Sequence, residues 1–179
     1  DGVNFEHLSF REALDKAKSE QKYVFMDCYT SWCGPCKYMS NTVFPQEKMG
    51  DYMNPKFICV KYDMEKGEGP ELAKKFGVRA YPTFVIVNPD GTIRHKLVGG
   101  GEGEQFIERV KESFDDNKAL GALDAKYNSG NRDKAFLSQY AKAMVANYDP
   151  NAKAIVDELL KISTDEEKLS EDYWFIFGN

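Results

Sequence analysis

Residues that bind zinc are scarce in the sequence, and they are not spaced as ligand pairs. Structural zinc sites take their ligands from closely spaced cysteine or histidine pairs. Cys33 and Cys36 form one C-x-x-C motif, and the chain has no second one. The other candidate ligands are isolated: His7, Cys28, Cys59 and His95. We therefore expect no metal site, and four cysteines in 179 residues are too few for a disulfide-held scaffold.

Other absences exclude whole classes of protein. No apolar run is long enough to cross a membrane, and no basic cluster accompanies the net charge of −5. We expect neither a membrane span in this chain nor a nucleic-acid partner. Residues 1–5 do not resemble a signal peptide. Because residue 1 is Asp rather than Met, we expect the natural chain to follow a removed export signal or lipid anchor.

The most informative stretch present is Trp32–Lys37, which reads Trp-Cys-Gly-Pro-Cys-Lys. Pro35 suits the first turn of a helix, since its fixed φ is already helical. Cys33 is then expected at the helix N-terminus, with Cys36 one turn inside and within disulfide reach. The helix end favours a thiolate, so Cys33 is predicted to attack and the less accessible Cys36 to resolve the mixed disulfide. A C-x-x-C alone fits half a zinc site or a structural disulfide equally well.

This stretch resembles, residue for residue, the active-site motif of thioredoxin. The resemblance implies an α/β thioredoxin fold, a central mixed β-sheet flanked by helices. It also implies a thiol–disulfide oxidoreductase that reduces protein disulfides and needs no cofactor beyond the Cys33–Cys36 redox disulfide. Its partners would be protein thiols and disulfides and an upstream electron donor. Six residues would bind the substrate: Trp32, Gly34, Pro35, Tyr81, Pro82 and Gly99.

Asp27 interrupts the apolar run Tyr23–Tyr29, which predicts a strand buried on both faces. A buried carboxylate must be paired, hydrogen-bonded or neutral; the alternative is an exposed Asp at a strand end. The resemblance implies that Asp27, six residues before Cys33, lies beneath the dithiol and exchanges the proton of Cys36. Burial is expected to raise its pKa towards a value useful to a general base.

A second strand, predicted over residues 56–63, carries Lys61 and Cys59 on one face by alternation. Lys61 matches the thioredoxin lysine near the buried Asp and is predicted to hold Asp27 as a carboxylate. Alternatively, its side chain extends to water. Alternation also puts Cys28 on the opposite face of the sheet from Cys59, so we expect two buried free cysteines.

Tyr81 and Pro82 begin a further segment of the resemblance. Base rates favour a trans X–Pro bond, whereas thioredoxins carry a cis proline here, opposite the dithiol. The resemblance implies that the Tyr81 backbone binds an extended substrate segment by β-augmentation. Tyr81 itself replaces a smaller aliphatic residue. Gly99 or Gly100 matches a thioredoxin glycine beside the active site that lets a partner backbone approach.

Sequence patterns predict the other elements. Ser9 and Glu12 form a capping box for a helix up to about residue 20. Further helices are expected from Pro35 and over 44–53, 69–77 and 104–114, and a turn at 88–91 joins strands 83–87 and 92–98. His95 lies between Arg94 and Lys96 and is predicted to face solvent.

We place a domain boundary after residue 117, between a thioredoxin-like domain (1–117) and an all-helical extension (118–179). Helices are expected over 132–147, from 150, and over 168–177 after a capping box of Thr164 and Glu167. Residues 173–179 are too apolar for a solvated tail. They are expected to pack on something, unless the extension is truncated and the natural chain continues.

The helix that begins at Pro35 and the short helix after it resemble the thioredoxin-like domains of exported thiol–disulfide interchange proteins, such as the C-terminal domain of DsbD. That resemblance implies an extracytoplasmic (periplasmic) location after removal of an export signal; the alternative is cytoplasmic. The competing function is a partner-binding scaffold whose helical tail recruits a protein and whose redox site is regulatory or vestigial.

Overall fold

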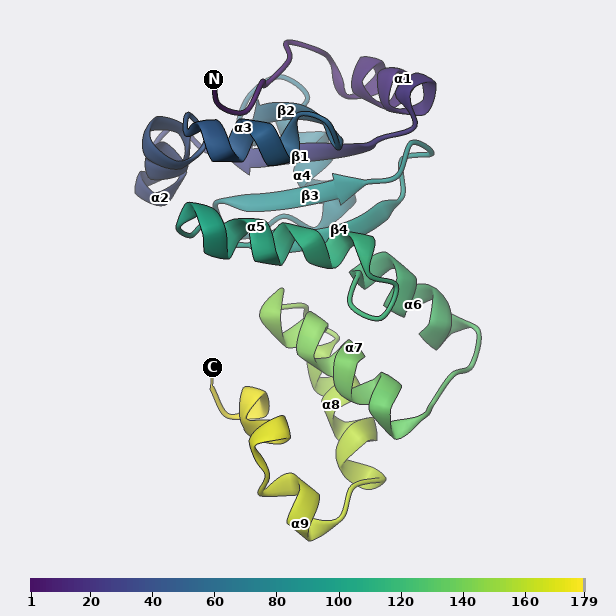
Figure 1. Ribbon diagram of the computed structural model, residues 1–179. Coiled ribbons are helices and arrows are strands. Elements are labelled where there is room, and N and C mark those ends of the chain that lie inside the picture. The colour runs from purple at the N-terminus through teal and green to yellow at the C-terminus, as the bar shows by residue number, and fades with distance from the viewer. Residues whose placement is uncertain (179) are drawn as a thin grey trace. The chain divides into compact units, whose positions relative to one another are not determined.

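The computed structural model describes residues 1–178, which divide into two compact units. The first comprises Asp1–Ser113 and the second begins at Phe114. Figure 1 shows a sheet with flanking helices in the first unit and helices alone in the second. The chain therefore combines a thioredoxin-like α/β fold with further C-terminal helices, which confirms the predicted fold class.

The sheet has four strands in the order β2-β1-β3-β4. Strand β1 (Tyr23–Tyr29) pairs in parallel with β2 (Phe57–Asp63) and antiparallel with β3 (Thr83–Val87). β3 pairs antiparallel with β4 (Ile93–Val98). The parallel and antiparallel pairs make the sheet mixed. The central position of β1 brings the residues that follow it to the carboxyl edge of the sheet.

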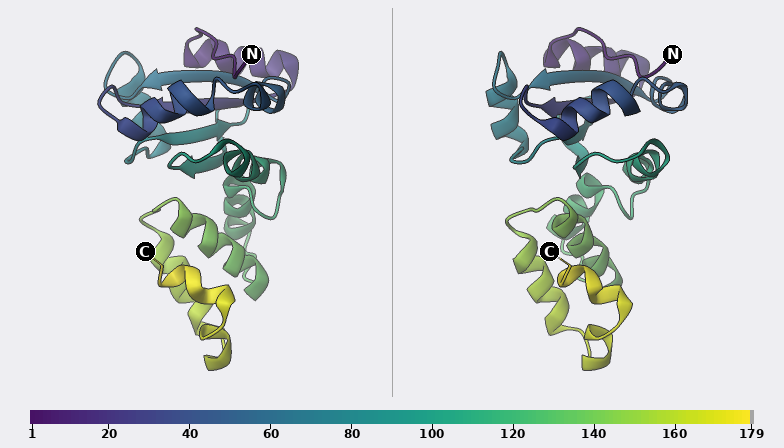
Figure 2. Two further views of the ribbon diagram at one scale, coloured as in Figure 1. Left: turned by 60° about the vertical axis from the view of Figure 1, so that its left-hand side comes forward. Right: turned by 90° about the vertical axis from the view of Figure 1, so that its left-hand side faces the viewer.

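Helices cover both faces of this sheet (Figure 2), which is why β1 and β3 are buried along their length. One face carries the core shared with α1 (Phe10–Glu20) and α4 (Gly69–Phe76). The other face packs against α3 (Glu47–Met53) and α5 (Gly103–Lys111). The predicted capping box of Ser9 and Glu12 opens α1.

Alternation along the strands separates the two spare cysteines as predicted. Cys28 lies in the core under α1 and α4, and Cys59 in the core under α3 and α5. Both are buried and free. Since a strand turns successive side chains to opposite faces, neighbouring strands placed these two thiols on different sides of the sheet.

His95 corrects the sequence-based expectation, because it is buried, with 4% of its surface exposed. It stands opposite Ile86 in the β3–β4 register, and Ile86 belongs to the core under α5. The residues after α5 cover it, and its Nε2 lies 3.7 Å from Oε1 of Glu112. Lys96 lies on the other face, where its Nζ donates to the Phe76 and Gly77 carbonyls. A bulge in this register lets Arg94 donate to the Ser113 carbonyl on the α5 side.

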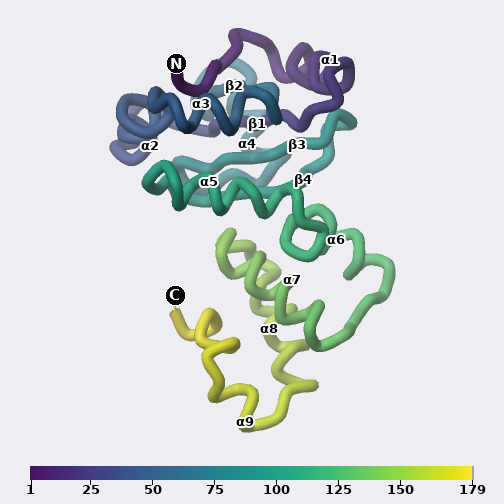
Figure 3. Tube along the Cα trace, viewed as in Figure 1, coloured from purple at the N-terminus to yellow at the C-terminus, as the bar shows by residue number. Residues whose placement is uncertain are grey.

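The second unit has its own apolar core. Its helices are α6 (Leu120–Asn128), α7 (Lys134–Ala146), α8 (Ala152–Lys161) and α9 (Asp165–Lys168), followed by the 3-10 helix Glu171–Ile176 (Figure 3). The expected helix 168–177 is therefore wrong: the capping box of Thr164 and Glu167 opens α9, which ends at Lys168, and Ser170 is extended. Tyr173 is buried, whereas Trp174 and Phe177 are exposed.

Within the described residues, none of the helices has the length and hydrophobicity needed to cross a membrane.

Candidate active site

The dithiol stands in the turn that follows β1. The strand ends at Tyr29, and α2 (Gly34–Tyr38) begins four residues after Thr30, with Cys33 as its N-cap and Pro35 in its first turn. The Cys33 Sγ accepts a hydrogen bond from the Cys36 backbone N–H at 3.1 Å. The two cysteines are joined by a disulfide with Cα atoms 5.3 Å apart. The structure therefore has the helix-start geometry that the motif predicts.

Accessibility does not separate the two sulfurs in this oxidised state. Cys33 is 4% exposed and Cys36 6%, so the expectation that Cys36 is the less accessible of the two is not met. What separates them is the backbone: Cys33 caps the helix and receives an N–H, whereas Cys36 lies one turn inside. N–H donors at a helix start stabilise a thiolate more than a thiol.

Asp27 is buried in the sheet, six residues before Cys33 and 3% exposed. Its Oδ1 has no hydrogen-bond partner among the described residues. Desolvation raises the pKa of Asp27 to about 7, and the positive charge of Lys61 opposes that rise. Burial therefore produces a carboxyl group that titrates near neutral pH, and an exposed strand-end Asp is excluded.

Lys61 stands directly opposite Asp27 in the parallel β1–β2 register. Its side chain is exposed, and its Nζ lies 3.4 Å from the Ser40 hydroxyl and 5.5 Å from the centre of the Phe5 ring. No ion pair with Asp27 occurs among the described residues. Both sequence-based alternatives hold in part, because the ammonium reaches water while its charge still lowers the pKa of Asp27.

Trp32 and Tyr81 form an aromatic contact beside the dithiol. Their ring centroids are 6.0 Å apart in an edge-to-face arrangement, and Trp32 is 64% exposed. The Tyr81–Pro82 peptide bond is cis. Sequence reasoning missed Glu65, whose Oε1 accepts a hydrogen bond from the Trp32 indole at 2.9 Å. No motif marks Glu65, because it reaches Trp32 only through the pairing of β2 with β1.

Gly99 extends the β3–β4 ladder to the cis proline, since its N–H donates to the Pro82 carbonyl at 2.8 Å. Its φ of +85° is one that glycine adopts without strain. The adjacent Gly100 packs so closely on Met39 that a Cβ there would lie 2.6 Å from the Met39 Sδ. The structure thus links the predicted residues Pro82 and Gly99 directly and ties their loop to the helix that carries the dithiol.

Two further residues in this loop region carried no signal in the sequence. Arg109 of α5 donates to backbone carbonyls of residues 98–100, and the Tyr38 hydroxyl donates to Oε1 of Glu102 at 2.7 Å. Arg109 reaches back to the loop that precedes its own helix, whereas Tyr38 contacts the loop from 64 residues away. Neither contact follows from a sequence motif.

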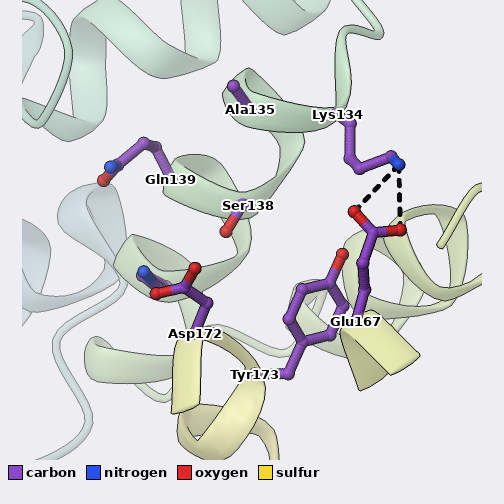
Figure 4. A pocket seen from close by; sticks show the side chains of 8 residues that line it. Lys134, Ala135, Ser138, Gln139, Glu167, Asp172 and Tyr173 are labelled. Atoms are coloured by element: carbon purple, nitrogen blue, oxygen red, sulfur yellow. Dashed lines mark hydrogen bonds and ion pairs between the residues drawn. The ribbon is translucent and has the colours of Figure 1, made fainter. Parts of the chain in front are cut away.

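No cluster of three or more potential metal-ligating His, Cys, Asp or Glu side chains occurs in residues 1–178. The second unit contains an open pocket of about 560 Å³ (Figure 4), where Lys134 forms an ion pair with Glu167. Ser138, Asp172 and Tyr173 also line it. None of the predicted site residues lies there.

Comparisons with known proteins agree with this geometry. The model of a thioredoxin-like domain matches residues 10–113. The chain is 34% identical over 108 residues to a chloroplastic thioredoxin Y of Oryza sativa subsp. japonica, covering 60% of this chain and 58% of that one. It is 28% identical over 100 residues to the thiol:disulfide interchange protein DsbD of Pseudomonas fluorescens, covering 54% of this chain and only 17% of DsbD. The chain thus spans less than two thirds of either relative.

Among solved structures, the chain is similar to a candidate disulphide-isomerase from Bacteroides thetaiotaomicron. The two are 47% identical with a TM-score of 0.59, and the match covers 64% of this chain and 95% of that one. The match to the family model lies within the α/β unit that carries the dithiol, and the second unit lies outside it.

Proposed function

The chain belongs to the thioredoxin-like domain family, and from that premise we propose that it is a thiol–disulfide oxidoreductase that reduces protein disulfides. One observation carries this proposal: the Cys33 sulfur caps a helix and is bonded to Cys36 one turn away. This pair can open to a dithiol and close again without rearranging the backbone that holds it.

In the proposed reaction, the Cys33 thiolate attacks one sulfur of a substrate disulfide. A mixed disulfide forms between Cys33 and the substrate, and the other substrate sulfur leaves as a thiolate that takes up a proton. The Cys36 thiol then loses its proton and attacks the Cys33 sulfur. The second substrate sulfur leaves, so two electrons have passed from the dithiol to the substrate.

Asp27 is the proposed acceptor of the Cys36 proton. A base works best when its pKa lies close to the working pH, and the pKa of Asp27 is about 7. Lys61 is proposed to tune this group, since its charge lowers the pKa of Asp27 from the next strand.

Substrate contacts are proposed for the backbone and rings around the sulfur. Trp32 offers an exposed ring, Gly34 and Pro35 are exposed beside Cys33, and Tyr81 is half-buried against Trp32. Pro82 and Gly99, joined by their hydrogen bond, would present backbone to an extended segment of substrate.

The cycle closes when an upstream dithiol donor reduces Cys33–Cys36 again, and no cofactor is needed beyond these two cysteines. The donor and substrate are proteins in this proposal. An extracytoplasmic site of action is proposed from the similarity to DsbD. Fractionation of the native source, with cytoplasmic and periplasmic marker proteins as controls, tests that location.

The scaffold alternative is not favoured, because the dithiol has the geometry of a working redox pair. The boundary after residue 117 and the recruitment of a protein by the helical extension stay proposals.

A turbidity assay of insulin reduction with dithiothreitol tests the function, with Cys33→Ser as the control. We expect rapid precipitation only with the wild type; equal rates in both proteins would contradict the proposal.

A further inference from the structure

Arg109 is the one arginine of α5, and its guanidinium donates three hydrogen bonds to backbone carbonyls in the loop beside α2. Nη1 donates to the carbonyls of Gly99 and Gly100, each at 3.0 Å, and Nη2 donates to the carbonyl of Val98 at 2.9 Å. The planar fork of arginine presents five N–H donors in a fixed geometry, so one guanidinium can serve all three of these carbonyls.

The guanidinium is itself held in place. Arg109 is half-buried, and its Cζ lies 5.8 Å from the centre of the Phe106 ring, which is fully buried in the core. Desolvation lowers the pKa of Arg109, and the neighbouring Glu112 opposes that effect. A cation partly withdrawn from water in this way is retained because carbonyl dipoles replace the lost hydration.

The same loop is fixed on its other side by Met39, the first residue of the π-helix Met39–Val43 that continues α2. The Gly101 N–H lies 3.5 Å from the Sδ of Met39, and Met39 comes three residues after Cys36. The Gly99 N–H donates to Pro82. The loop is thus bound at its carbonyls by Arg109, at one amide by Met39, and at another by the cis proline.

We propose that Arg109 is a positioning residue for the substrate: by holding the carbonyls of Val98–Gly100 it keeps the backbone beside Pro82 in its binding conformation before a protein disulfide arrives. This inference rests on the proposed function and deepens it, because it concerns how substrate is held and not how the sulfurs react. Preorganised backbone lowers the entropy lost when an extended segment binds. Arg109 itself takes no part in the reaction of the sulfurs.

The test is steady-state kinetics of protein-disulfide reduction by Arg109→Met, which keeps an unbranched apolar stem and removes the donors. We expect KM to rise about 5-fold with kcat nearly unchanged, since the loss affects binding in ground and transition states alike. The pH profile of Cys33 alkylation should match the wild type. Arg11→Met is the matched control, because Arg11 is exposed on α1, where it forms an ion pair with Asp15.

A second measurement does not depend on turnover. Amide hydrogen exchange should be faster at Gly99 in the variant and unchanged at Phe25 in β1. If Arg109→Met does not fold, as judged by circular dichroism, Arg109→Lys replaces it: lysine keeps the charge but not the fork, and a rise in KM of about 2-fold is expected.

Each of the following outcomes would overturn the inference. An unchanged KM with an unchanged Gly99 exchange rate would overturn the inference while the proposed function stood. A shifted alkylation profile or a fall in kcat alone would also overturn it, since Arg109 would then act on the sulfur. Wild-type activity no higher than that of Cys33→Ser would defeat the proposed function itself, and the inference with it.

Discussion

The dithiol turn and the sheet interior each hold two cysteines, and all four are buried, yet their surroundings are opposite. In the turn, the Cys33 Sγ receives a backbone N–H, and exposed residues flank it on both sides. In the sheet, Cys28 and Cys59 lie in apolar cores on opposite faces. Desolvation raises the pKa of Cys59 to about 12 and that of Cys28 still further.

The comparison shows that burial alone does not make a thiol inert. When a buried sulfur accepts a hydrogen bond from an N–H group in place of water, its thiolate is stabilised. A sulfur surrounded by apolar side chains has no such stabilisation. The Sγ of Cys28 donates to the Met26 carbonyl at 3.9 Å, and a carbonyl offers nothing to a thiolate. Local backbone geometry therefore divides reactive from structural cysteine in this chain.

The largest effect should come from replacing the capping sulfur. Cys33→Ser is expected to lower insulin reduction at least about 100-fold, because a hydroxyl is a far weaker nucleophile at neutral pH than a thiolate. Cys59→Ala serves as the matched control. It should keep full activity and lose about 1–2 kcal/mol in the free energy of unfolding. Activity lost equally in both variants would erase the distinction between turn and sheet.

The next effect concerns alkylation of the reduced, folded protein. At pH 7 even an ordinary thiol is more ionised than Cys59 by about 1000-fold, since their pKa values differ by about three units. We expect iodoacetamide to modify Cys33 at least that much faster than Cys28 or Cys59, as mass spectrometry of peptides would report. In denaturant the rates should converge. Comparable rates in the native state would contradict the division.

Asp27 lies within the sheet but is proposed to accept a proton from Cys36 in the dithiol turn. The Asp27→Asn variant separates its burial in the sheet from this proton transfer. Its pKa is raised from 3.8 to about 7 in the folded protein, so the folded state binds its proton more tightly than the unfolded chain. Stability from this group is complete below about pH 4 and is lost as pH rises to about 7. The oxidised variant should therefore exceed wild type by up to about 4 kcal/mol above pH 7, and match it near pH 4.

Urea denaturation at half-unit steps from pH 4 to pH 8 measures this difference. Asp15→Asn, an exposed aspartate on α1, is the control and should show no such trend. A gap between Asp27→Asn and wild type that does not change with pH would mean that Asp27 is not buried as a titrating group.

The smallest effect is expected from Lys61→Gln. Removing its charge should raise the pKa of Asp27 slightly, because the ammonium is exposed and screened by water. The midpoint of the pH dependence described above would move upward by that amount. Lys56→Gln, on the approach to the same strand, should leave the midpoint in place. A downward shift in Lys61→Gln would reverse the assigned sign.

Much of the fold could be predicted from the sequence, because it follows from patterns that span only a few residues. The capping box at Ser9, the apolar run of β1 and the helix start at Pro35 each act over a few residues, and each appears in the structure. Three expectations were wrong: that His95 faces solvent, that one helix covers 168–177, and that Cys36 is less accessible than Cys33. His95 is buried because residues after α5, distant in sequence, cover it. The predicted helix is interrupted because the backbone of Ser170 is extended.

The sequence by itself determined the identity and spacing of the reacting groups, since two thiols on one turn of a helix need only local geometry to meet. Tertiary structure alone decided their surroundings: the indole bond to Glu65, the burial that moves the pKa of Asp27, and the grip of Arg109 on the loop at Gly99. The indole bond joins residues 33 positions apart, and Arg109 reaches ten positions back along the chain. These contacts arise only when the sheet register and the helix above it bring distant backbone together, and no local pattern encodes that.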